Sequence, residues 1–233
     1  MPEIPAFLAA RAEAWFGRAC TVLETETLAP RLRRVRFGGA PLKRCGWRPG
    51  HEVEVRVGAR EFRHYTPMRW DDARGEVDIL FYLHGRGPGS AWAEALREGD
   101  ATHLMGPGGR LRLDADAAHH VFLGDETTAG LFAALARAVP PSAGLTGAVE
   151  GEGLPPDLFT AMGLPLDVLS RGPTRGAALL AWLDRVVTVD SVYYLAGHAE
   201  SVVALRRALQ RQWSIPARRI RTKAYWSDNR RGL

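Results

Sequence analysis

The first half of the chain alternates between short extended runs and turn-forming residues. Polar and apolar side chains follow one another in His51 to Val57, the pattern of a strand with one buried face. Clusters of Gly, Pro or Asp separate such runs, as in small antiparallel barrels. The strands expected in this half are Cys20 to Leu28, Leu32 to Phe37, His51 to Val57, Glu61 to Thr66, Val77 to Leu83 and Thr102 to Met105, with one helix over Ser90 to Arg97. Met1 to Phe16 is expected to form a short amphipathic helix or a loosely docked arm.

In the second half, after Asp114-Ala115-Asp116, strands alternate with helices. Continuous apolar runs predict strands at Val121 to Leu123, Leu145 to Val149, Leu166 to Leu169 and Ser191 to Ala196. Helical spacing of apolar residues extends over Thr127 to Val139, Ala177 to Val186 and Val202 to Trp213. This alternation predicts a parallel sheet with helices on both faces. The sequence therefore predicts an antiparallel β-barrel domain over residues 1–114 and an α/β domain over residues 115–233.

The stretch from Arg60 to Trp92 carries the most informative chemistry. On a strand, residues two apart share a face, so Arg63 and Tyr65 project together. A guanidinium matches two phosphate oxygens at once, and a tyrosine ring can stack on a planar heterocycle. Pro67 should end the strand and hold Thr66 in an extended conformation at its exit. This set of residues favours binding of a dinucleotide with a flat redox ring. The same four residues would also fit an ordinary strand with one exposed Arg and one half-buried Tyr.

A glycine-rich loop follows this strand. Gly85-Arg86-Gly87-Pro88-Gly89-Ser90 leads into a helical run that begins Ala91-Trp92. Ser90 suits the N-cap position, and the free backbone N–H groups of a helix start attract phosphate. The loop is therefore predicted to be a second phosphate-binding element, next to Arg63 and Tyr65.

Five motifs in order resemble the siderophore-interacting proteins, which are FAD-containing ferric-siderophore reductases within the ferredoxin-reductase superfamily. They are Arg63-His64-Tyr65-Thr66, the run LHGRGPGSAW, GDETTAGL from Gly124, YYLAGHAESVVALRRAL, and Ala224-Tyr225-Trp226. The resemblance extends from about Cys20 to Trp226. It implies a flavin-binding barrel followed by an NAD(P)-binding domain. It also implies that Tyr65 and Thr66 are catalytic and that FAD is bound by Arg63, Tyr65, Thr66, His84, Gly85, Gly87, Gly89, Ser90 and Trp92.

Three strand ends in the second half carry candidate residues, because ligands of parallel sheets bind beyond the carboxyl ends of the strands. The resemblance places Gly124, Asp125, Glu126 and Thr127 at the nicotinamide cofactor, although a capped turn explains them equally well. Ser170 and Arg171 could take the 2′-phosphate of NADPH, and a plain surface arginine is nearly as good an interpretation. Gly197 and His198 end the third strand. His198 departs from the Ala-Gly-Glu that the family commonly has there.

The C-terminal run is expected to border the flavin and the substrate. Arg219 to Lys223 alternates like a strand, which would put Arg219, Arg221 and Lys223 on one face. In the family a Tyr-Trp pair follows the last strand and lies near the isoalloxazine, and the resemblance carries this role to Tyr225 and Trp226. Lys223, Arg230 and Arg231 would then attract an anionic ferric siderophore. The alternative is a solvated basic tail.

The composition of the chain restricts the kinds of molecule that it is expected to bind. The net charge of +5 would suit nucleic acid, but arginine is spread along the whole chain and no nucleic-acid motif is present, which favours an anionic small molecule. No apolar run approaches the roughly 20 residues of a membrane span, and no signal pattern opens the chain, so a cytoplasmic protein without membrane insertion is expected. Cys20 and Cys45 lack the spacing of a disulfide framework or a metal site.

The leading functional hypothesis is an NADPH- or NADH-dependent, FAD-containing ferric-siderophore reductase. Such an enzyme needs a cofactor that links two-electron and one-electron transfer, because NAD(P)H delivers a hydride while Fe(III) accepts one electron. A flavin can take part in both kinds of transfer. Hard oxygen donors hold Fe(III) better than Fe(II), so reduction frees the iron from a siderophore or another ferric chelate. The alternatives are a flavin reductase that passes electrons to another protein, and a siderophore-binding protein without cofactor. The intact Arg63, Tyr65 and Thr66 argue against the last. The sequence specifies neither the siderophore nor an oligomeric state.

Overall fold

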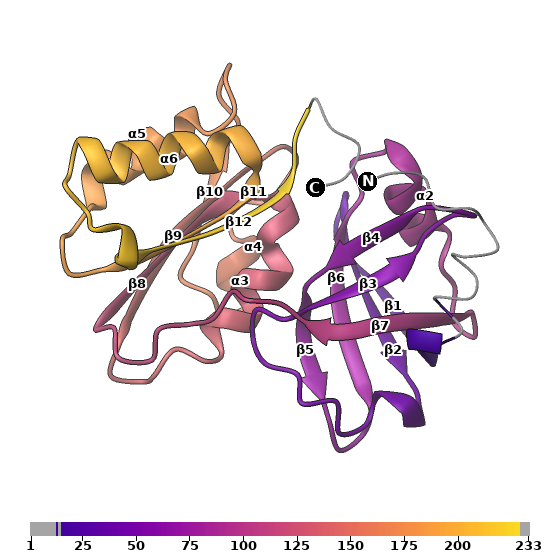
Figure 1. Ribbon diagram of the computed structural model, residues 1–233. Coiled ribbons are helices and arrows are strands. Elements are labelled where there is room, and N and C mark those ends of the chain that lie inside the picture. The colour runs from indigo at the N-terminus through magenta and orange to yellow at the C-terminus, as the bar shows by residue number, and fades with distance from the viewer. Residues whose placement is uncertain (1–12, 14, 229–233) are drawn as a thin grey trace. The chain divides into compact units, whose positions relative to one another are not determined.

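The computed structural model of the chain describes residues 13 and 15–228 (Figure 1). The chain divides into two compact units, Met1–Arg112 and Leu113–Leu233. The sequence had placed the division near residue 114. The arm expected over Met1 to Phe16 lies almost entirely outside the described residues.

The first unit is built on a seven-stranded sheet in the order β4-β3-β7-β1-β2-β6-β5. The strands are β1 (Gly17–Ala29), β2 (Leu32–Gly38), β3 (Glu52–Arg56), β4 (Phe62–Tyr65), β5 (Pro67–Asp71), β6 (Glu76–Tyr82) and β7 (Ala101–Gly108). All neighbouring strands are antiparallel. The inward side chains form one core, in which Val35, Phe37, Val55, Val77 and Ile79 have no exposed surface. β3 buries every second residue, which explains why the alternation in His51 to Val57 predicted this strand.

The two edges of this sheet meet at Thr66. β4 and β5 are the outermost strands, and Thr66 alone joins them in the chain. The sheet must therefore curl until its edges approach each other there, which makes it barrel-like. β5 was missed because Pro67 was expected only to end a strand. Proline does end β4, but it is tolerated as the first residue of an edge strand, where its missing N–H costs no hydrogen bond.

The helix of the first unit, α2 (Gly87–Ala95), begins earlier than predicted. Its N-cap is Arg86, and Ser90 lies inside the helix, so the N-cap assignment of Ser90 is wrong. The Ser90 hydroxyl instead accepts a hydrogen bond from the Gly85 N–H at 3.1 Å and holds the glycine loop against the helix. At the other end, the guanidinium of Arg33 donates to the carbonyls of Ala93, Glu94 and Leu96 at 2.7–2.9 Å.

The second unit contains a five-stranded parallel sheet in the order β10-β9-β8-β11-β12. The strands are β8 (His119–Asp125), β9 (Gly144–Gly151), β10 (Asp167–Ser170), β11 (Val192–His198) and β12 (Ile220–Trp226). All residues of β11 are buried, as expected for a strand covered on both faces. The parallel α/β class predicted from the sequence is confirmed.

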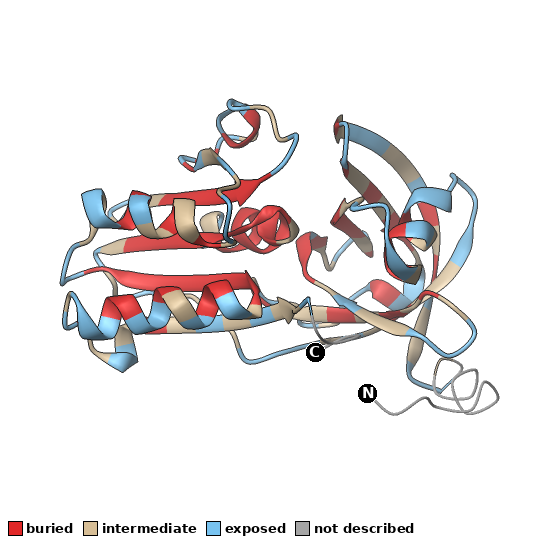
Figure 2. Cartoon of the chain, turned by 90° about the horizontal axis from the view of Figure 1, so that it is seen from above, coloured by how far each residue is buried: buried red, intermediate tan, exposed pale blue. Residues whose placement is uncertain are grey.

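Helices cover both faces of this sheet (Figures 1 and 2). α5 (Ala177–Val186) and α6 (Ala199–Arg211) pack with each other on one face, against Val121, Leu123, Tyr193 and Leu195. On the other face Phe122 stacks on Phe132 of α3 (Ala129–Ala136) with ring centroids 5.2 Å apart. α3 is buried from Ala129 to Leu135, and a helix that is apolar all round belongs inside the protein.

Several predicted boundaries in this unit are wrong. A 3-10 turn (Glu126–Thr128) precedes α3, and the one-turn helix α4 (Leu158–Ala161) was too short to show a period. Arg219 lies in a second 3-10 turn (Ala217–Arg219), so it does not share a strand face with Arg221 and Lys223. β12 extends through Trp226, and the Tyr-Trp pair is therefore part of the last strand instead of following it.

His120 is expected to make the protein less stable in mild acid. Its side chain is completely buried beside Tyr194, and neither ring nitrogen has a hydrogen-bond partner among the residues that the structure describes. Burial, helped by the charge of His119, lowers the pKa of His120 below 6.5, so the unfolded chain takes up this proton first. The free energy of unfolding should fall below pH 6.5 by up to about 1.4 kcal/mol per pH unit for this group.

The variant His120→Leu, which conserves side-chain volume, tests this expectation. Chemical denaturation between pH 5 and 8 should give a shallower decline below about pH 6.5 for the variant than for the parent protein. Parallel curves would show that the pKa of His120 is the same in the folded and the unfolded protein.

Candidate functional site

Arg63 and Tyr65 lie on the same side of β4, as the period of two predicts. Both approach Gly89 in the first turn of α2: a Cβ at Gly89 would lie 2.5 Å from the Tyr65 hydroxyl and 3.3 Å from Cγ of Arg63. Only glycine permits this approach between strand and helix. The predicted residues of the strand and of the glycine loop are thus brought together.

The ring of Tyr65 is part of an aromatic cluster. Its centroid lies 4.7 Å from that of Phe81, edge to face, and 6.5 Å from that of Trp92, nearly parallel. Burial raises the pKa of Tyr65 to about 12, although the charge of Arg63 opposes the rise. The phenol therefore stays protonated and acts as a hydrogen-bond donor or a stacking surface, never as a phenolate base at neutral pH. Thr66 is buried at the junction of the two sheet edges.

The start of α2 offers donors suited to a pyrophosphate. Arg86, at the N-cap, gives no side-chain cap to the first turn. Arg63 donates to the Phe62 carbonyl at 2.7 Å and, within the described part of the chain, pairs with no carboxylate. Free N–H groups at a helix start together with an uncompensated guanidinium fit two phosphate groups. Gly85 precedes this turn, Gly87 is its first residue, and His84 accepts the Arg86 N–H at 3.2 Å.

In the second unit, the carboxylate of Asp125 joins three strands at their carboxyl ends. Oδ1 accepts from the backbone N–H and the hydroxyl of Thr127 at 2.9 and 2.5 Å. Oδ2 accepts from the His198 backbone N–H at 2.7 Å and the Trp226 indole at 3.0 Å. Burial raises the pKa of Asp125, as does the charge of Glu126, while the hydrogen bonds oppose the rise. Since Asp125 accepts the Thr127 N–H, this N–H is not free to bind a phosphate.

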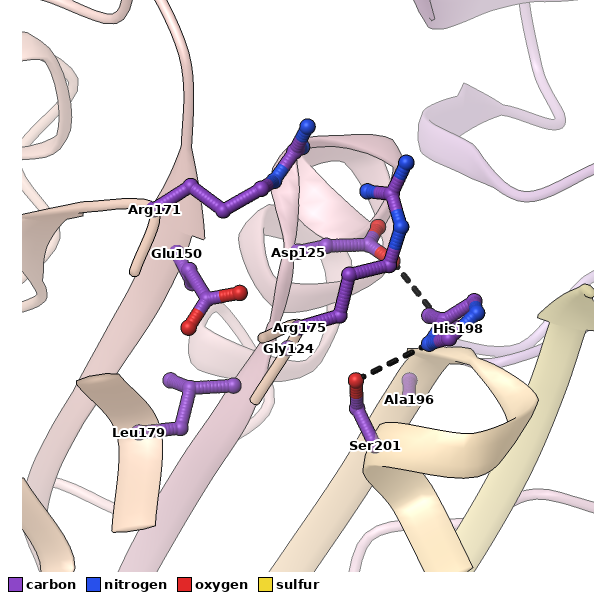
Figure 3. Close-up of a pocket in the computed structure, with 9 residues that line it drawn as sticks. All are labelled: Gly124, Asp125, Glu150, Arg171, Arg175, Leu179, Ala196, His198 and Ser201. Atoms are coloured by element: carbon purple, nitrogen blue, oxygen red, sulfur yellow. Dashed lines mark hydrogen bonds between the residues drawn. The ribbon is translucent and has the colours of Figure 1, made fainter. Parts of the chain in front are cut away.

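A pocket lies beside Asp125 (Figure 3). It is lined by Gly124, Asp125, Glu150, Arg171, Arg175, Leu179, Ala196, His198 and Ser201. Four of the predicted residues, Gly124, Asp125, Arg171 and His198, are therefore brought together. Figure 3 shows the guanidinium groups of Arg171 and Arg175 extending to the same side of this pocket.

Glu150 and Arg175 were not predicted. The buried Glu150 carboxylate accepts the N–H groups of Gly176 and Ala178 at 2.8 and 3.2 Å, and so it caps the start of α5. A carboxylate at a helix start is favourable. Glu150 directly follows the apolar run Leu145 to Val149, and its place at a strand end is a signal that could have revealed it.

Arg171 is not a free surface arginine. Its Nη2 pairs with Oε1 of Glu126, whose side chain is 4% exposed, and its Nη1 lies 3.4 Å from Oε1 of Glu152. Ser170, the neighbouring candidate, is exposed at the end of β10. The structure thus gives Arg171 a buried acidic partner that the sequence did not suggest.

His198 is surrounded by polar groups. Nδ1 lies 3.0 Å from the Ser201 hydroxyl, and Nε2 lies 2.9 Å from Glu200 and 3.3 Å from Asp228. Neither carboxylate has hydrogen-bond geometry to Nε2. The backbone of Gly197 has φ +99°, and its Cα lies so close to Asp125 that a Cβ would be 2.5 Å from Oδ2.

Trp226 is fixed by its neighbours at the end of β12. Its ring lies 4.7 Å from that of His198, and the Arg175 guanidinium lies over it at 4.6 Å. Tyr225 and Lys223 are half-buried on the same strand, and burial lowers the pKa of Lys223. The other two residues predicted to meet the substrate, Arg230 and Arg231, lie outside the described residues.

None of the helices in residues 13 and 15–228 combines the length and apolar character that a bilayer crossing demands.

Known proteins resemble both units. The model of the siderophore-interacting FAD-binding domain matches residues 58–111, and that of the siderophore-interacting protein matches residues 117–229. The ferric vibriobactin reductase ViuB of Vibrio cholerae is 28% identical over 172 residues, which are 70% of this chain and 64% of ViuB. The NADPH-dependent ferric-chelate reductase of Escherichia coli is 28% identical over 70% of this chain and 65% of its own. The chain thus spans slightly less than two thirds of the length of these relatives.

Solved structures share the fold. The siderophore-interacting protein of Acinetobacter baumannii superposes with a TM-score of 0.78 at 18% identity, over 91% of this chain and 90% of that one. A siderophore utilization protein from T. fusca gives 0.78 at 24% identity, over 93% and 95%. Phthalate dioxygenase reductase gives 0.75 at 15% identity, over 94% and 71%. The fold is that of the ferredoxin-reductase-like flavoproteins, and with both domain models matched in order, the chain belongs to the siderophore-interacting protein family.

Proposed function

We propose that this protein is an FAD-containing oxidoreductase that uses NADH or NADPH to reduce the Fe(III) of a ferric siderophore or a similar ferric chelate. The observation that carries the proposal is the convergence of Arg63, Tyr65 and the uncapped start of α2 on Gly89. It gives the first unit donors for a pyrophosphate next to an aromatic surface. The matched FAD-binding model and the names of the relatives support the same activity.

In this proposal the two units have different tasks. Arg63 and the first-turn N–H groups of α2 hold the flavin pyrophosphate, and Tyr65, protonated at neutral pH, orients the ring and takes no proton from it. The pocket beside Asp125 binds the nicotinamide coenzyme. Bound FAD would accept a hydride and pass on electrons singly. Reduction of the iron weakens its bonds to hard oxygen donors and so promotes release.

An absorption spectrum of the purified protein tests the proposal directly. Flavin bands should be present, should bleach when NADH or NADPH is added without oxygen, and should return when ferric citrate is added. A strong Fe(II) chelator should then trap Fe(II). A colourless protein that does not take up added FAD would refute the proposal.

The first-unit site predicts that Arg63→Ala weakens FAD binding. Loss of a charge-assisted phosphate contact should cost about 1.5–3 kcal/mol, or roughly ten- to a hundredfold in affinity. Fluorescence titration of the apoprotein with FAD gives the affinity, and circular dichroism shows whether the variant is folded. Arg60→Ala, an exposed arginine in the same unit, is the matched control. Equal FAD affinity of Arg63→Ala and the parent would place the pyrophosphate elsewhere.

We further propose that Lys223, together with Arg230 and Arg231, attracts an anionic ferric chelate. Lys223→Ala should raise KM for ferric citrate by about two- to fivefold at low salt, because the half-buried ammonium group attracts an anion and salt screens such an attraction over roughly 10 Å at 0.1 M. The difference should shrink at higher salt, and the rate of flavin reduction by the coenzyme should stay unchanged. A KM with the parent's value and salt dependence would remove Lys223 from the substrate site.

A further inference from the structure

We propose that the pocket of the second unit selects NADH over NADPH, because its guanidinium groups are already paired with the protein's own carboxylates. The inference rests on the proposed function, since it names the coenzyme of that reaction. It assigns the discrimination to Glu126, Glu152 and Arg171, at the ends of β8, β9 and β10.

Arg171 is the cation that the sequence suggested for a 2′-phosphate, and two acids already face it. Nη2 binds Glu126, which is 4% exposed, and Nη1 lies 3.4 Å from Glu152, which is 61% exposed. The three side chains together carry a net charge of about −1 at neutral pH. If Arg171 turned to a phosphate, Glu126 would be left as a buried carboxylate without a counter-charge, which is strongly unfavourable.

Two further groups of donors in this pocket also face carboxylates. The Nε of Arg175 lies 3.3 Å from Asp228, and its guanidinium lies over Trp226. The N–H groups at the start of α5, which would suit a phosphate, donate to the buried Glu150. Arg175 and the start of α5, two further places that would suit a phosphate group, therefore each face a carboxylate.

The local charge has the opposite sign to that of the whole chain. Around the pocket stand two arginines and six carboxylates, those of Asp125, Glu126, Glu150, Glu152, Glu200 and Asp228. The chain as a whole has a net charge of +5. A 2′-phosphate brings about 1.5 to 2 further negative charges, which this edge repels. The 2′-hydroxyl of NADH is neutral and can donate to an acid at a strand end.

This preference would differ from that of the Escherichia coli relative, which is named NADPH-dependent. The two chains are only 28% identical, so the residues around Arg171 can differ between them. A single acidic residue gained or lost beside this arginine is enough to change the local charge.

Binding measurements that do not depend on turnover provide the test. Calorimetry on the flavin-loaded protein should show NAD⁺ binding at least about tenfold more tightly than NADP⁺, a difference of about 1.4 kcal/mol. The fragments 5′-AMP and adenosine 2′,5′-bisphosphate should follow the same order. Anaerobic stopped flow should show faster flavin bleaching with NADH than with NADPH at low coenzyme concentration.

The variant Glu152→Gln removes the exposed acid and keeps the buried pair of Glu126 and Arg171. It should bind NADP⁺ on the order of three- to tenfold more tightly than the parent at low salt, and NAD⁺ unchanged or more weakly. Asp184→Asn removes an equal charge from an exposed position of α5 outside the pocket and should change neither affinity.

The possible failures are distinguishable. Tighter binding of NADP⁺ than of NAD⁺ by the parent overturns the inference and leaves the proposed function intact. An NADP⁺ affinity of Glu152→Gln equal to the parent's overturns the assignment to the Arg171 cluster. If neither coenzyme binds or bleaches the flavin, the proposed function fails, and the inference with it.

Discussion

Replacing Arg171 by alanine is expected to lower the free energy of unfolding by about 3–5 kcal/mol. The variant leaves Glu126, 4% exposed, with a charge and no guanidinium to balance it. Glu152 is too exposed to suffer in the same way. Urea denaturation followed by circular dichroism measures the change, and the loss should appear in the transition of the second unit.

A second variant separates this charge effect from lost packing. Arg171→Ala combined with Glu126→Gln should recover a large part of the stability, because a neutral amide needs no counter-charge. Arg185→Ala, at an exposed position of α5, should change stability by less than about 0.5 kcal/mol. If the single Arg171 variant were as stable as the Arg185 variant, the ion pair with Glu126 would contribute nothing to folding.

Gly197→Ala is expected to destabilise the second unit by about 3–5 kcal/mol. The backbone at φ +99° is strained for any other residue, at about 1–3 kcal/mol. In addition, a Cβ would lie 2.5 Å from Oδ2 of Asp125 and displace the carboxylate from the His198 N–H and the Trp226 indole. Each lost charge-assisted hydrogen bond adds about 1.5–3 kcal/mol, less whatever relaxation recovers.

Gly163→Ala is the matched control for this prediction. Gly163 also has a positive φ, +74°, but a Cβ there would meet no atom within 4 Å. It should cost only the backbone strain, about 1 kcal/mol, in the same thermal denaturation experiment. Similar losses in the two variants would mean that the Asp125 carboxylate moves away without penalty, and that it does not hold the three strands together.

The elements that could be predicted from the sequence are those whose buried residues follow a regular pattern along the chain. β3 and α6 show a clear period because one face of each is buried, and β8 shows a continuous apolar run because nearly all of its residues are buried. β5 and α4 could not be predicted: β5 begins at Pro67 and does not alternate regularly in burial, and α4 is a single turn. Their positions are set by the strands and helices they pack against, which lie elsewhere in the sequence.

The same holds for the candidate site: some of its contacts could be predicted from the sequence and others could not. Arg63 and Tyr65 were placed on one face because the period of a strand alone decides it. The partner of Arg171 could not be predicted, because Glu126 is 45 residues away and only the pairing of β8, β9 and β10 brings the two together. The role of Arg171 at a 2′-phosphate stays a prediction, and its pairing with Glu126 is what the order of residues along the chain could not reveal.

The arginines at the C-terminal end of α2 affect the electrostatic potential at its N-terminal end. A helix is an electric dipole, with roughly half a positive charge at its start and half a negative charge at its end. Here the negative pole is covered by Arg33 and by Arg97, whose Nη1 lies 2.9 Å from each of three carbonyl oxygens. The negative end of the helix therefore cancels less of the field of the positive end. As a result, the electrostatic potential beyond Gly87 is more positive. Arg33 thus favours an anion at the start of α2 without touching it, from the far end of a nine-residue helix.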